Sequence, residues 1–146
     1  MVQKTKQLVL VIIQFTCISL LVLTGPVITK AIGLQLLQVA AFVIGCLAII
    51  NMNASRLSVL PAPLPGARLI TNGIYKYIRH PMYNAVLLMC GSWLLNYLSP
   101  FRIIIFFILL TDIIIKIVTE EKLLQINFAE YALYKKKTWR LLPFIF

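Results

Sequence analysis

Charged residues are so sparse in the first third of the chain that they leave two long apolar runs. Lys6 and Lys30 are separated by 23 residues without charge, and Lys30 and Arg56 by 25. A helix rises ~1.5 Å per residue, so each run is long enough to cross a hydrocarbon core of ~30 Å. Proline removes a backbone donor and restricts the residue before it, which predicts that the first helix ends at Gly25-Pro26.

Two further apolar runs lie close together in the second half of the chain. They extend from about Met82 to Leu98 and from about Phe101 to Val118, and Ser99-Pro100 joins them. So short a connection forces the two helices to be antiparallel neighbours. We therefore predict an all-α polytopic membrane bundle of four spanning helices, in which the third and fourth spans form a tight hairpin.

The remaining stretches contain most of the polar residues. An extended connector is predicted for residues 51–72, which contain four helix-breaking residues: Pro61, Pro63, Pro65 and Gly66. After Thr119 the chain becomes amphipathic, which predicts a helix through about Tyr134, then basic residues and an apolar tail over 141–146. The pattern leaves open whether residues 137–146 cross the membrane, re-enter it or lie on it.

All of these parts are predicted to form a single membrane-embedded domain, residues 1–146. It comprises two N-terminal spans (1–50), a connector with a polar motif (51–83), a helical hairpin (84–118) and a C-terminal polar segment (119–146). The start of the chain, Met1 to Lys6 before an apolar run, resembles a signal peptide. No small-residue cleavage site followed by a soluble domain is present, so we expect a retained first helix.

Composition supports the membrane assignment. The chain is 61% hydrophobic and 12% charged, whereas soluble domains carry roughly 25% charged residues. In a soluble protein the net charge of +10 would suggest nucleic-acid binding. Here the basic residues flank apolar runs, which is the pattern expected for contact with lipid headgroups. We expect the lipid bilayer as a partner, and no nucleic acid.

Four crossings would divide the basic residues unequally between the two sides of the membrane. Only Lys30 and Arg102 fall on one side. The other twelve fall together: Lys4, Lys6, Arg56, Arg68, Lys76, Arg79, Lys116, Lys122, Lys135, Lys136, Lys137 and Arg140. The positive-inside rule makes the larger group cytosolic. We therefore predict a multi-pass protein whose two termini, and any site built from residues 69–83 and 119–143, face the cytosol.

The single histidine, His80, stands between Arg79 and Pro81 at the start of the third apolar run. Pro81 suits the first turn of a helix, which leaves His80 at or next to the cap, near a helix end that attracts carboxylates and phosphates. A lone interfacial histidine is also often only a polar anchor. The neighbouring tyrosines are typical of an aromatic belt, most clearly Tyr77: Tyr75, Tyr77 and Tyr83.

Acidic residues are rare, and three of the four lie in or just after the fourth apolar run. Asp112, Lys116 and Glu120 are spaced by four, so they share one helical face. Either Asp112 and Lys116 form an intrahelical pair that reaches the interface, or this face lines a cavity open to the cytosol. Glu120 and Glu121 point about 100° apart on a helix, so at most one is expected to face a pocket.

Several kinds of site are excluded. The three cysteines lie within apolar runs without the spacing of a metal or redox site and are expected to be buried: Cys17, Cys46 and Cys90. We therefore expect no metal. No glycine-rich phosphate loop is present, which excludes a soluble nucleotide-binding fold. No serine stands with a histidine and an acid in the pattern of a nucleophilic site.

Polar and aromatic residues form two blocks of sequence. The first is Thr71-Asn-Gly-Ile-Tyr-Lys-Tyr-Ile-Arg-His-Pro-Met-Tyr83, which has the form G-x-Y-x-x-x-R-H-P-x-Y. The second begins at Glu120-Glu121 and continues through Tyr134 and the following lysines to Leu142-Pro143. Together the two blocks resemble the isoprenylcysteine carboxyl methyltransferases and the related phospholipid N-methyltransferases. The resemblance covers about residues 68–146, and the first two spans carry no signature.

The resemblance implies a small membrane enzyme that uses S-adenosylmethionine to methylate a carboxylate or an amine of a lipid-like or prenylated acceptor. It implies six cofactor-binding residues: His80, Tyr83, Glu120, Glu121, Tyr134 and Pro143. The candidates for a catalytic role are His80, Glu121 and Arg140. A carboxylate acceptor needs no general base, whereas an amine must lose a proton, which His80 or a nearby carboxylate can take.

The second block departs from the family pattern at Ala129, Lys137 and Trp139, where glycine, arginine and proline are usual. These departures leave the acceptor open. Two alternatives to methyl transfer are an NADPH-dependent enzyme related to the sterol reductases and a non-catalytic membrane adaptor of the same fold. The sequence contains no strong small-residue motif for helix pairing, so the oligomeric state is also open.

Overall fold

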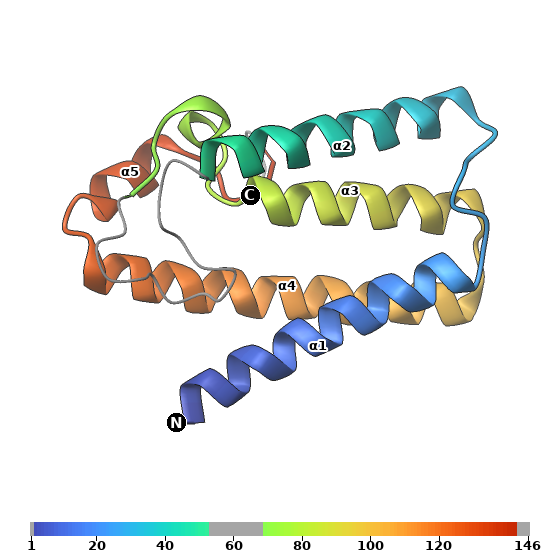
Figure 1. The fold of residues 1–146 in the computed structure, drawn as a ribbon, viewed down its shortest axis with the longest axis horizontal. Helices are drawn as coiled ribbons and strands as arrows, with labels where there is room; N and C mark the ends of the chain where they lie inside the picture. Colours follow the sequence, from blue (N-terminus) through green and yellow to red (C-terminus); the bar gives the residue numbers. More distant parts are fainter. Residues whose placement is uncertain (1, 53–68, 143–146) are drawn as a thin grey trace.

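The computed structural model describes residues 2–52 and 69–142, and most of these residues are helical (Figure 1). Within them lie five α-helices and one short 3-10 helix, and no strand: α1 (Val2–Leu23), α2 (Ile32–Met52), η1 (Gly73–Lys76), α3 (Pro81–Asn96), α4 (Pro100–Asn127) and α5 (Tyr131–Lys137). The all-α prediction is confirmed. The predicted connector lies largely outside the described residues, which exclude 53–68.

The helix ends follow the proline and glycine positions. α1 stops two residues before Gly25, and α3 and α4 each begin at a proline, Pro81 and Pro100. Proline fits the first helical turn because its missing N–H would have no intrahelical partner there. Ser99 caps α4, since its Oγ accepts a hydrogen bond from the backbone N–H of Arg102 at 3.3 Å.

One predicted helix is wrong. The amphipathic segment after Thr119 does not continue to Tyr134, because α4 ends at Asn127 and α5 begins only at Tyr131. Phe128 adopts an extended conformation, and its N–H closes the last turn of α4 by bonding to the carbonyl of Leu124. Asparagine is common at helix ends, but no glycine or proline indicates this break in the sequence.

Two pairs of helices dominate the packing: α2 lies along α3, and α1 lies along α4 (Figure 1). A hydrophobic cluster joins α1, α3, α4 and the C-terminal segment: Cys17, Leu21, Cys90, Ile105, Leu109, Ile113, Ile117 and Leu141. All three cysteines are free thiols. Cys17 and Cys90 are buried, as predicted, whereas Cys46 is half-buried.

Arg102 of α4 forms hydrogen bonds to α3 and to the end of α1, at the end of the molecule opposite α5. Its side chain is buried and donates to the carbonyl oxygens of Leu21 at 2.8 Å and Trp93 at 2.7 Å. It also donates to Thr24 Oγ1 at 3.0 Å. A Cβ at Gly25 would collide with this guanidinium, which explains the glycine next to the end of α1.

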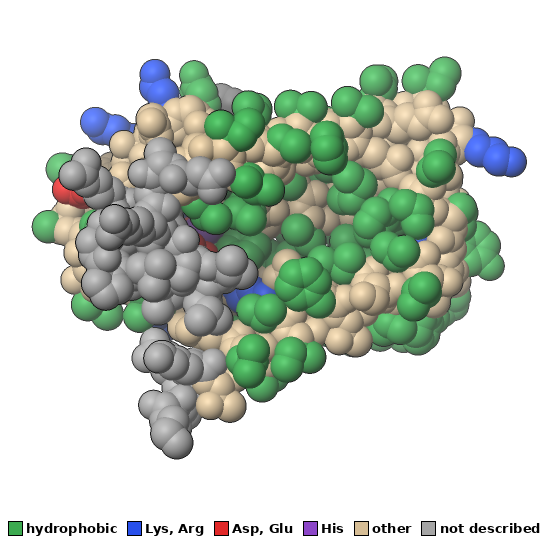
Figure 2. All heavy atoms as spheres, viewed as in Figure 1, with side chains coloured by type: hydrophobic (Ala, Val, Ile, Leu, Met, Phe, Trp, Pro, Cys, Tyr) green, Lys and Arg blue, Asp and Glu red, His purple; other side chains and the backbone are tan. Residues whose placement is uncertain are grey.

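The outer surface is mainly apolar. In the described part of the chain, two helical stretches are long and apolar enough to cross a membrane: Thr5–Leu23 and Ile32–Met52. Only 17% and 11%, respectively, of an apolar 18-residue window in each is buried. Figure 2 shows hydrophobic side chains spread over the middle of one face, with Lys and Arg projecting near its two ends. Such a surface suits lipid rather than water.

Candidate active site

Gly73 shapes the segment that leads into α3. It has a φ of +56°, a left-handed conformation that is costly for residues with a Cβ. A Cβ at this position would also collide with the side chain of Asn51, near the end of α2. Only glycine therefore lets η1 pack against α2 and places Arg79 and His80 at the start of α3.

The C-terminal segment pairs with this same stretch of backbone. Ile78 and Trp139 form an isolated parallel bridge. The N–H of Trp139 donates to the carbonyl of Tyr77 at 3.0 Å, and the N–H of Arg79 donates to the carbonyl of Trp139 at 2.7 Å. A third bond, from His80 N–H to the carbonyl of Arg140 at 3.1 Å, brings the Arg140 backbone beside His80.

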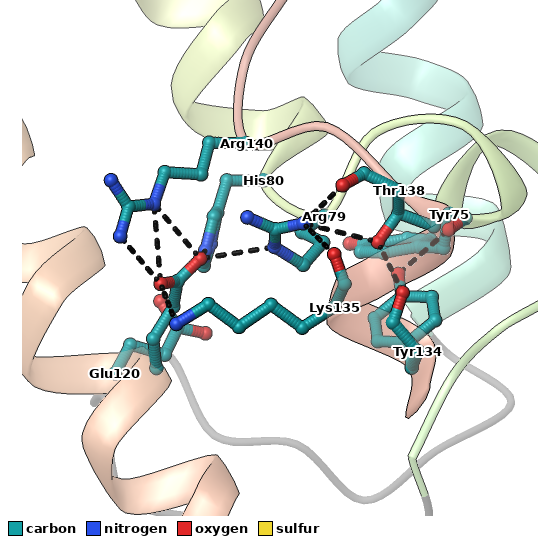
Figure 3. A network of polar contacts seen from close by, with 9 residues as sticks. Tyr75, Arg79, His80, Glu120, Tyr134, Lys135, Thr138 and Arg140 are labelled. Carbon is teal, nitrogen blue, oxygen red and sulfur yellow. Dashed lines mark hydrogen bonds and ion pairs between the residues drawn. The ribbon is translucent and has the colours of Figure 1, made fainter. Parts of the chain in front are cut away.

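Glu121 lies at the centre of a polar network, and its basic partners Arg79, Lys135 and Arg140 are labelled in Figure 3. Its Oε1 is 3.0 Å from Arg79 Nε and 3.5 Å from His80 Nε2, and the second contact lacks hydrogen-bond geometry. Its Oε2 is 3.0 Å from Arg140 Nη2 and 3.6 Å from Lys135 Nζ. Four side chains from two distant segments thus contact one buried carboxylate.

These contacts keep Glu121 ionised. Burial alone would raise its pKa, but the contact with His80, the hydrogen bonds from Arg140 and the charge of Arg79 outweigh burial and hold the pKa well below its usual range. The carboxylate therefore stays negative at any physiological pH.

Glu120 lies on the other side of the imidazole. Its Oε2 is 3.7 Å from His80 Nδ1, so both neighbouring acids reach the histidine, although only one was expected to face the site. This is possible because the two ring nitrogens face different parts of α4. The side chain of Glu120 is 26% exposed and that of Glu121 only 4%. Glu120 is therefore the acid that a ligand can approach.

Tyrosines enclose the site. The ring of Tyr83 stacks on His80 with a centroid separation of 5.8 Å. The Tyr134 hydroxyl donates to the carbonyl of Tyr75 at 2.6 Å, which fastens α5 to η1. Burial and the charge of Glu120 raise the pKa of Tyr75 to about 12. Tyr75 is buried, so the belt interpretation is wrong for it, whereas Tyr77 is exposed as that interpretation requires.

The sequence did not single out Arg79, Lys135 or Thr138 for this site. Arg79 donates to the carbonyl of Lys135 at 3.0 Å, and to both the carbonyl and, at 3.3 Å, Oγ1 of Thr138. It therefore links the start of α3 to the end of α5. Its position in the Arg-His-Pro motif was the one sequence signal that could have assigned Arg79 to the site. That signal was not decisive, because a basic residue at a membrane edge can equally well bind lipid headgroups.

Asp112 and Lys116 form the predicted intrahelical pair, with 3.3 Å between Asp112 Oδ2 and Lys116 Nζ. Both side chains are buried, and Lys116 also donates to Gln14 Oε1 of α1.

Of the predicted site residues, His80, Tyr83, Glu120, Glu121 and Arg140 lie together, and Tyr134 contacts the adjoining η1. Pro143 lies outside the described residues. Among residues 2–52 and 69–142, no group of three or more histidines, cysteines or acids is placed to hold a metal ion. Whether these residues bind a cofactor stays a prediction.

The family model for phospholipid methyltransferases matches residues 40–131, well over half of the chain. The chain belongs to the phospholipid methyltransferase family. This confirms the resemblance drawn from the two sequence blocks and makes the protein a membrane methyltransferase in general terms. No curated protein and no solved structure shows significant similarity to the chain.

The region matched by the phospholipid methyltransferase model contains the first half of the site. It includes Arg79, His80, Glu120 and Glu121 and ends at Tyr131. The residues that α5 and the C-terminal segment add to the network, such as Lys135 and Arg140, lie beyond it. Arg140 is positioned by the backbone pairing with residues 77–80, and Lys135 by the hydrogen bond from Arg79 to its carbonyl.

Proposed function

We propose that this protein transfers a methyl group from S-adenosylmethionine to a carboxylate or an amine of a lipid-like or prenylated acceptor. The observation that supports this most is the convergence of His80, Glu120 and Glu121 at one end of the bundle. The family match adds the type of reaction, since methyltransferases of membrane families generally use this donor.

We further propose that α1, α2, α3 and α4 all cross the membrane, with the site and both termini in the cytosol. α4 has 28 residues and is about 42 Å long, longer than a hydrocarbon core of ~30 Å, so its end with Glu120 and Glu121 can reach the interface. α3, with 16 residues, is about 24 Å long and requires local thinning or snorkelling. The excess of basic residues near the site favours its cytosolic location.

The side chains of the site fit the chemical groups of S-adenosylmethionine. Its ribose hydroxyls and ammonium group need acceptors, and Glu120 offers a partly exposed carboxylate. Its carboxylate needs a cation, and the side chains of Arg140 and Lys135 are 29% and 41% exposed. Both oxygens of Glu121 already contact basic side chains, so its role is to hold these cations and His80 in position.

The donor supplies a methyl group on a positively charged sulfur, so neither a protein nucleophile nor a metal is needed. The protein aligns the two reactants and excludes water from them. A carboxylate acceptor attacks without a base. An amine acceptor must lose a proton, and Glu120 with His80, 3.7 Å apart at their nearest atoms, offers a pair that can take it.

A labelling experiment with variants tests the proposed function. Membranes containing the protein are incubated with methyl-labelled S-adenosylmethionine, and label is measured in lipid and in a farnesylated cysteine peptide. We expect transfer by the wild type and by Glu130→Gln, because Glu130 is exposed and its side chain makes no capping bond to α5. We expect Glu120→Gln to lose at least about tenfold in rate, equivalent to ~1.4 kcal/mol.

The stability of the label to base identifies the acceptor. A base-labile label indicates a methyl ester and a base-stable label a methylated amine. If membranes that contain the folded wild-type protein label neither acceptor, the proposed function is contradicted. If Glu120→Gln and Glu130→Gln transfer the methyl group equally well, the assigned site is contradicted.

A further inference from the structure

Aromatic and basic side chains are exposed together at the end of the molecule that carries the candidate active site. Tyr77 and Trp139 are 61% and 40% exposed. Their backbones are joined by the hydrogen bond from the N–H of Trp139 to the carbonyl of Tyr77 at 3.0 Å. Lys76 is also exposed, and its Nζ lies 6.0 Å from the centroid of the Tyr77 ring. Two segments far apart in the sequence therefore contribute to one surface.

The helix α5 adds two lysines to this surface. Its inner side is marked by Tyr131, which is fully buried. Leu133, Lys136 and Lys137 are exposed, and their spacing of three and four places them on one helical face. An exposed leucine beside two lysines is typical of a helix that lies on a membrane surface. We call the exposed basic and aromatic residues of η1, α5 and their flanking segments the basic-aromatic patch: Lys76, Tyr77, Lys136, Lys137 and Trp139.

The basic-aromatic patch has little negative charge near it within the protein. The chain has four acidic residues, and of these only Glu130 is exposed. Among the residues that the structure describes, none of Lys76, Lys136 and Lys137 forms an ion pair. An anionic ligand would therefore complement this end of the molecule.

The aromatic and apolar members of this surface favour a lipid over a free anion. A water-soluble anion needs only the lysines, whereas Tyr77, Trp139 and Leu133 offer exposed apolar area beside them. Tryptophan and tyrosine concentrate at the level of lipid headgroups, and basic segments next to membrane spans attract anionic lipids. The length of α4, which exceeds a hydrocarbon core, brings this end of the bundle to that level.

We propose that the basic-aromatic patch binds anionic phospholipids and enriches them around this end of the protein. The lysines bind the acidic headgroups, and the two aromatic rings lie beside them at the membrane interface. The lipid bound here is a neighbour of the protein and not its methyl acceptor. This inference rests on the proposed membrane crossings and is independent of methyl transfer.

Fluorescence quenching by brominated lipids tests the proposal. The chain has two tryptophans, so Trp93→Phe leaves Trp139 as the only one. The full-length variant is reconstituted without methyl donor into vesicles of phosphatidylcholine and phosphatidylglycerol in equal amounts, and only one of the two lipids carries bromine on its acyl chains. We expect brominated phosphatidylglycerol to quench Trp139 at least about twofold more than brominated phosphatidylcholine does. Equal quenching by the two lipids would overturn the proposal.

Charge variants in the same Trp93→Phe background separate the patch from the general charge of the protein. Lys136→Gln/Lys137→Gln should remove most of the preference, and so should salt at about 1 M, where the screening length is only ~3 Å. Lys6→Gln/Lys30→Gln removes two exposed charges outside the patch and should keep the preference. A preference that survives in the first double variant, or that is lost equally in both, would overturn the proposal.

A second tryptophan variant distinguishes failure of this proposal from failure of the proposed crossings. Trp139→Phe leaves only Trp93, which packs against the hydrophobic cluster, and we expect both brominated lipids to quench it equally. Quenching of Trp93 with none of Trp139 would leave the crossings intact and overturn the proposal. An equal preference for phosphatidylglycerol at Trp93 would also overturn it. Absence of quenching at either tryptophan would overturn both the crossings and the proposal.

Discussion

Glu121 shows how a single buried charge can organise two distant segments. A carboxylate with 4% of its side chain exposed requires partners, and it obtains them from Arg79 and His80 before α3 and from Lys135 and Arg140 after α4. Removing the charge would leave the basic side chains close together without compensation. Glu121 therefore stabilises the geometry of the site, whereas Glu120 remains accessible to a ligand.

We expect Glu121→Gln to reduce the free energy of unfolding by about 3–5 kcal/mol at neutral pH, because it breaks a buried ion pair. The folded-state pKa of Glu121 is depressed, so its contribution to stability is fully present above the unfolded value of about 4.3. The contribution is lost as the pH falls through the lower folded value. The difference in unfolding temperature from the wild type should be constant from pH 8 to 5 and shrink in stronger acid.

The measurement is thermal unfolding in detergent at a series of pH values, with Glu130→Gln as the control. Glu130 is exposed and should give the wild-type curve. A difference that disappears already near pH 6, or an equal loss in the control, would show that Glu121 does not hold the network through its charge.

At the scale of the elements, prolines and charge spacing determine most of what the sequence predicts. The positions of α1, α2, α3 and the start of α4 follow from uncharged runs bounded by Gly25-Pro26, Pro81 and Pro100. The break after Asn127 could not be predicted, since the backbone turns there without glycine or proline. The role of Arg79 was missed because its side-chain hydrogen bonds are all long-range: three go to Lys135 and Thr138, and one goes to Glu121.

That residues 77–80 and 120–140 come together in one site was predicted only from the resemblance of the two sequence blocks to family motifs. Nothing in local periodicity indicates that residues 138–140 pair with residues 77–80 through backbone hydrogen bonds. The motif residues His80, Glu120 and Glu121 were found because they match a family pattern, and the structure adds Arg79 and Lys135 as the groups that neutralise Glu121.

Gly73→Ala tests whether η1 positions the site. A residue with a Cβ at a φ of +56° costs roughly 1–2 kcal/mol, and the added Cβ also collides with Asn51. We expect lower thermal stability together with weaker binding of S-adenosylmethionine. Gly33→Ala, where an added Cβ meets nothing within 4 Å, should be neutral or slightly stabilising. Equal behaviour of the two variants would contradict this account of Gly73.

At the scale of the whole molecule, the apolar surface and the location of charge determine how the protein lies in the membrane. Lys30 and the buried Arg102 are near the turns opposite the site, whereas α5 ends in three consecutive lysines. Hydrophobic side chains are spread between these ends over the face shown in Figure 2. This arrangement agrees with a cytosolic site and two short connections, α1 to α2 and α3 to α4, on the opposite side.

Single-cysteine labelling tests this topology. With the three native cysteines replaced by serine, Gln125→Cys and Ile28→Cys each place one thiol at an exposed position near opposite ends of the bundle. We expect an impermeant thiol reagent added from the cytosolic side to label position 125 and not position 28. Labelling of both positions from one side would contradict four crossings.

The most direct test of the central claim is a calorimetric titration of the purified protein with S-adenosylmethionine and, separately, with NADPH. The account predicts binding of the methyl donor and none of the nicotinamide cofactor. It also predicts at least about tenfold weaker binding, ~1.4 kcal/mol, by His80→Ala, in a variant that still inserts into membranes. Heat with NADPH but none with S-adenosylmethionine, or unchanged affinity in His80→Ala, would contradict it.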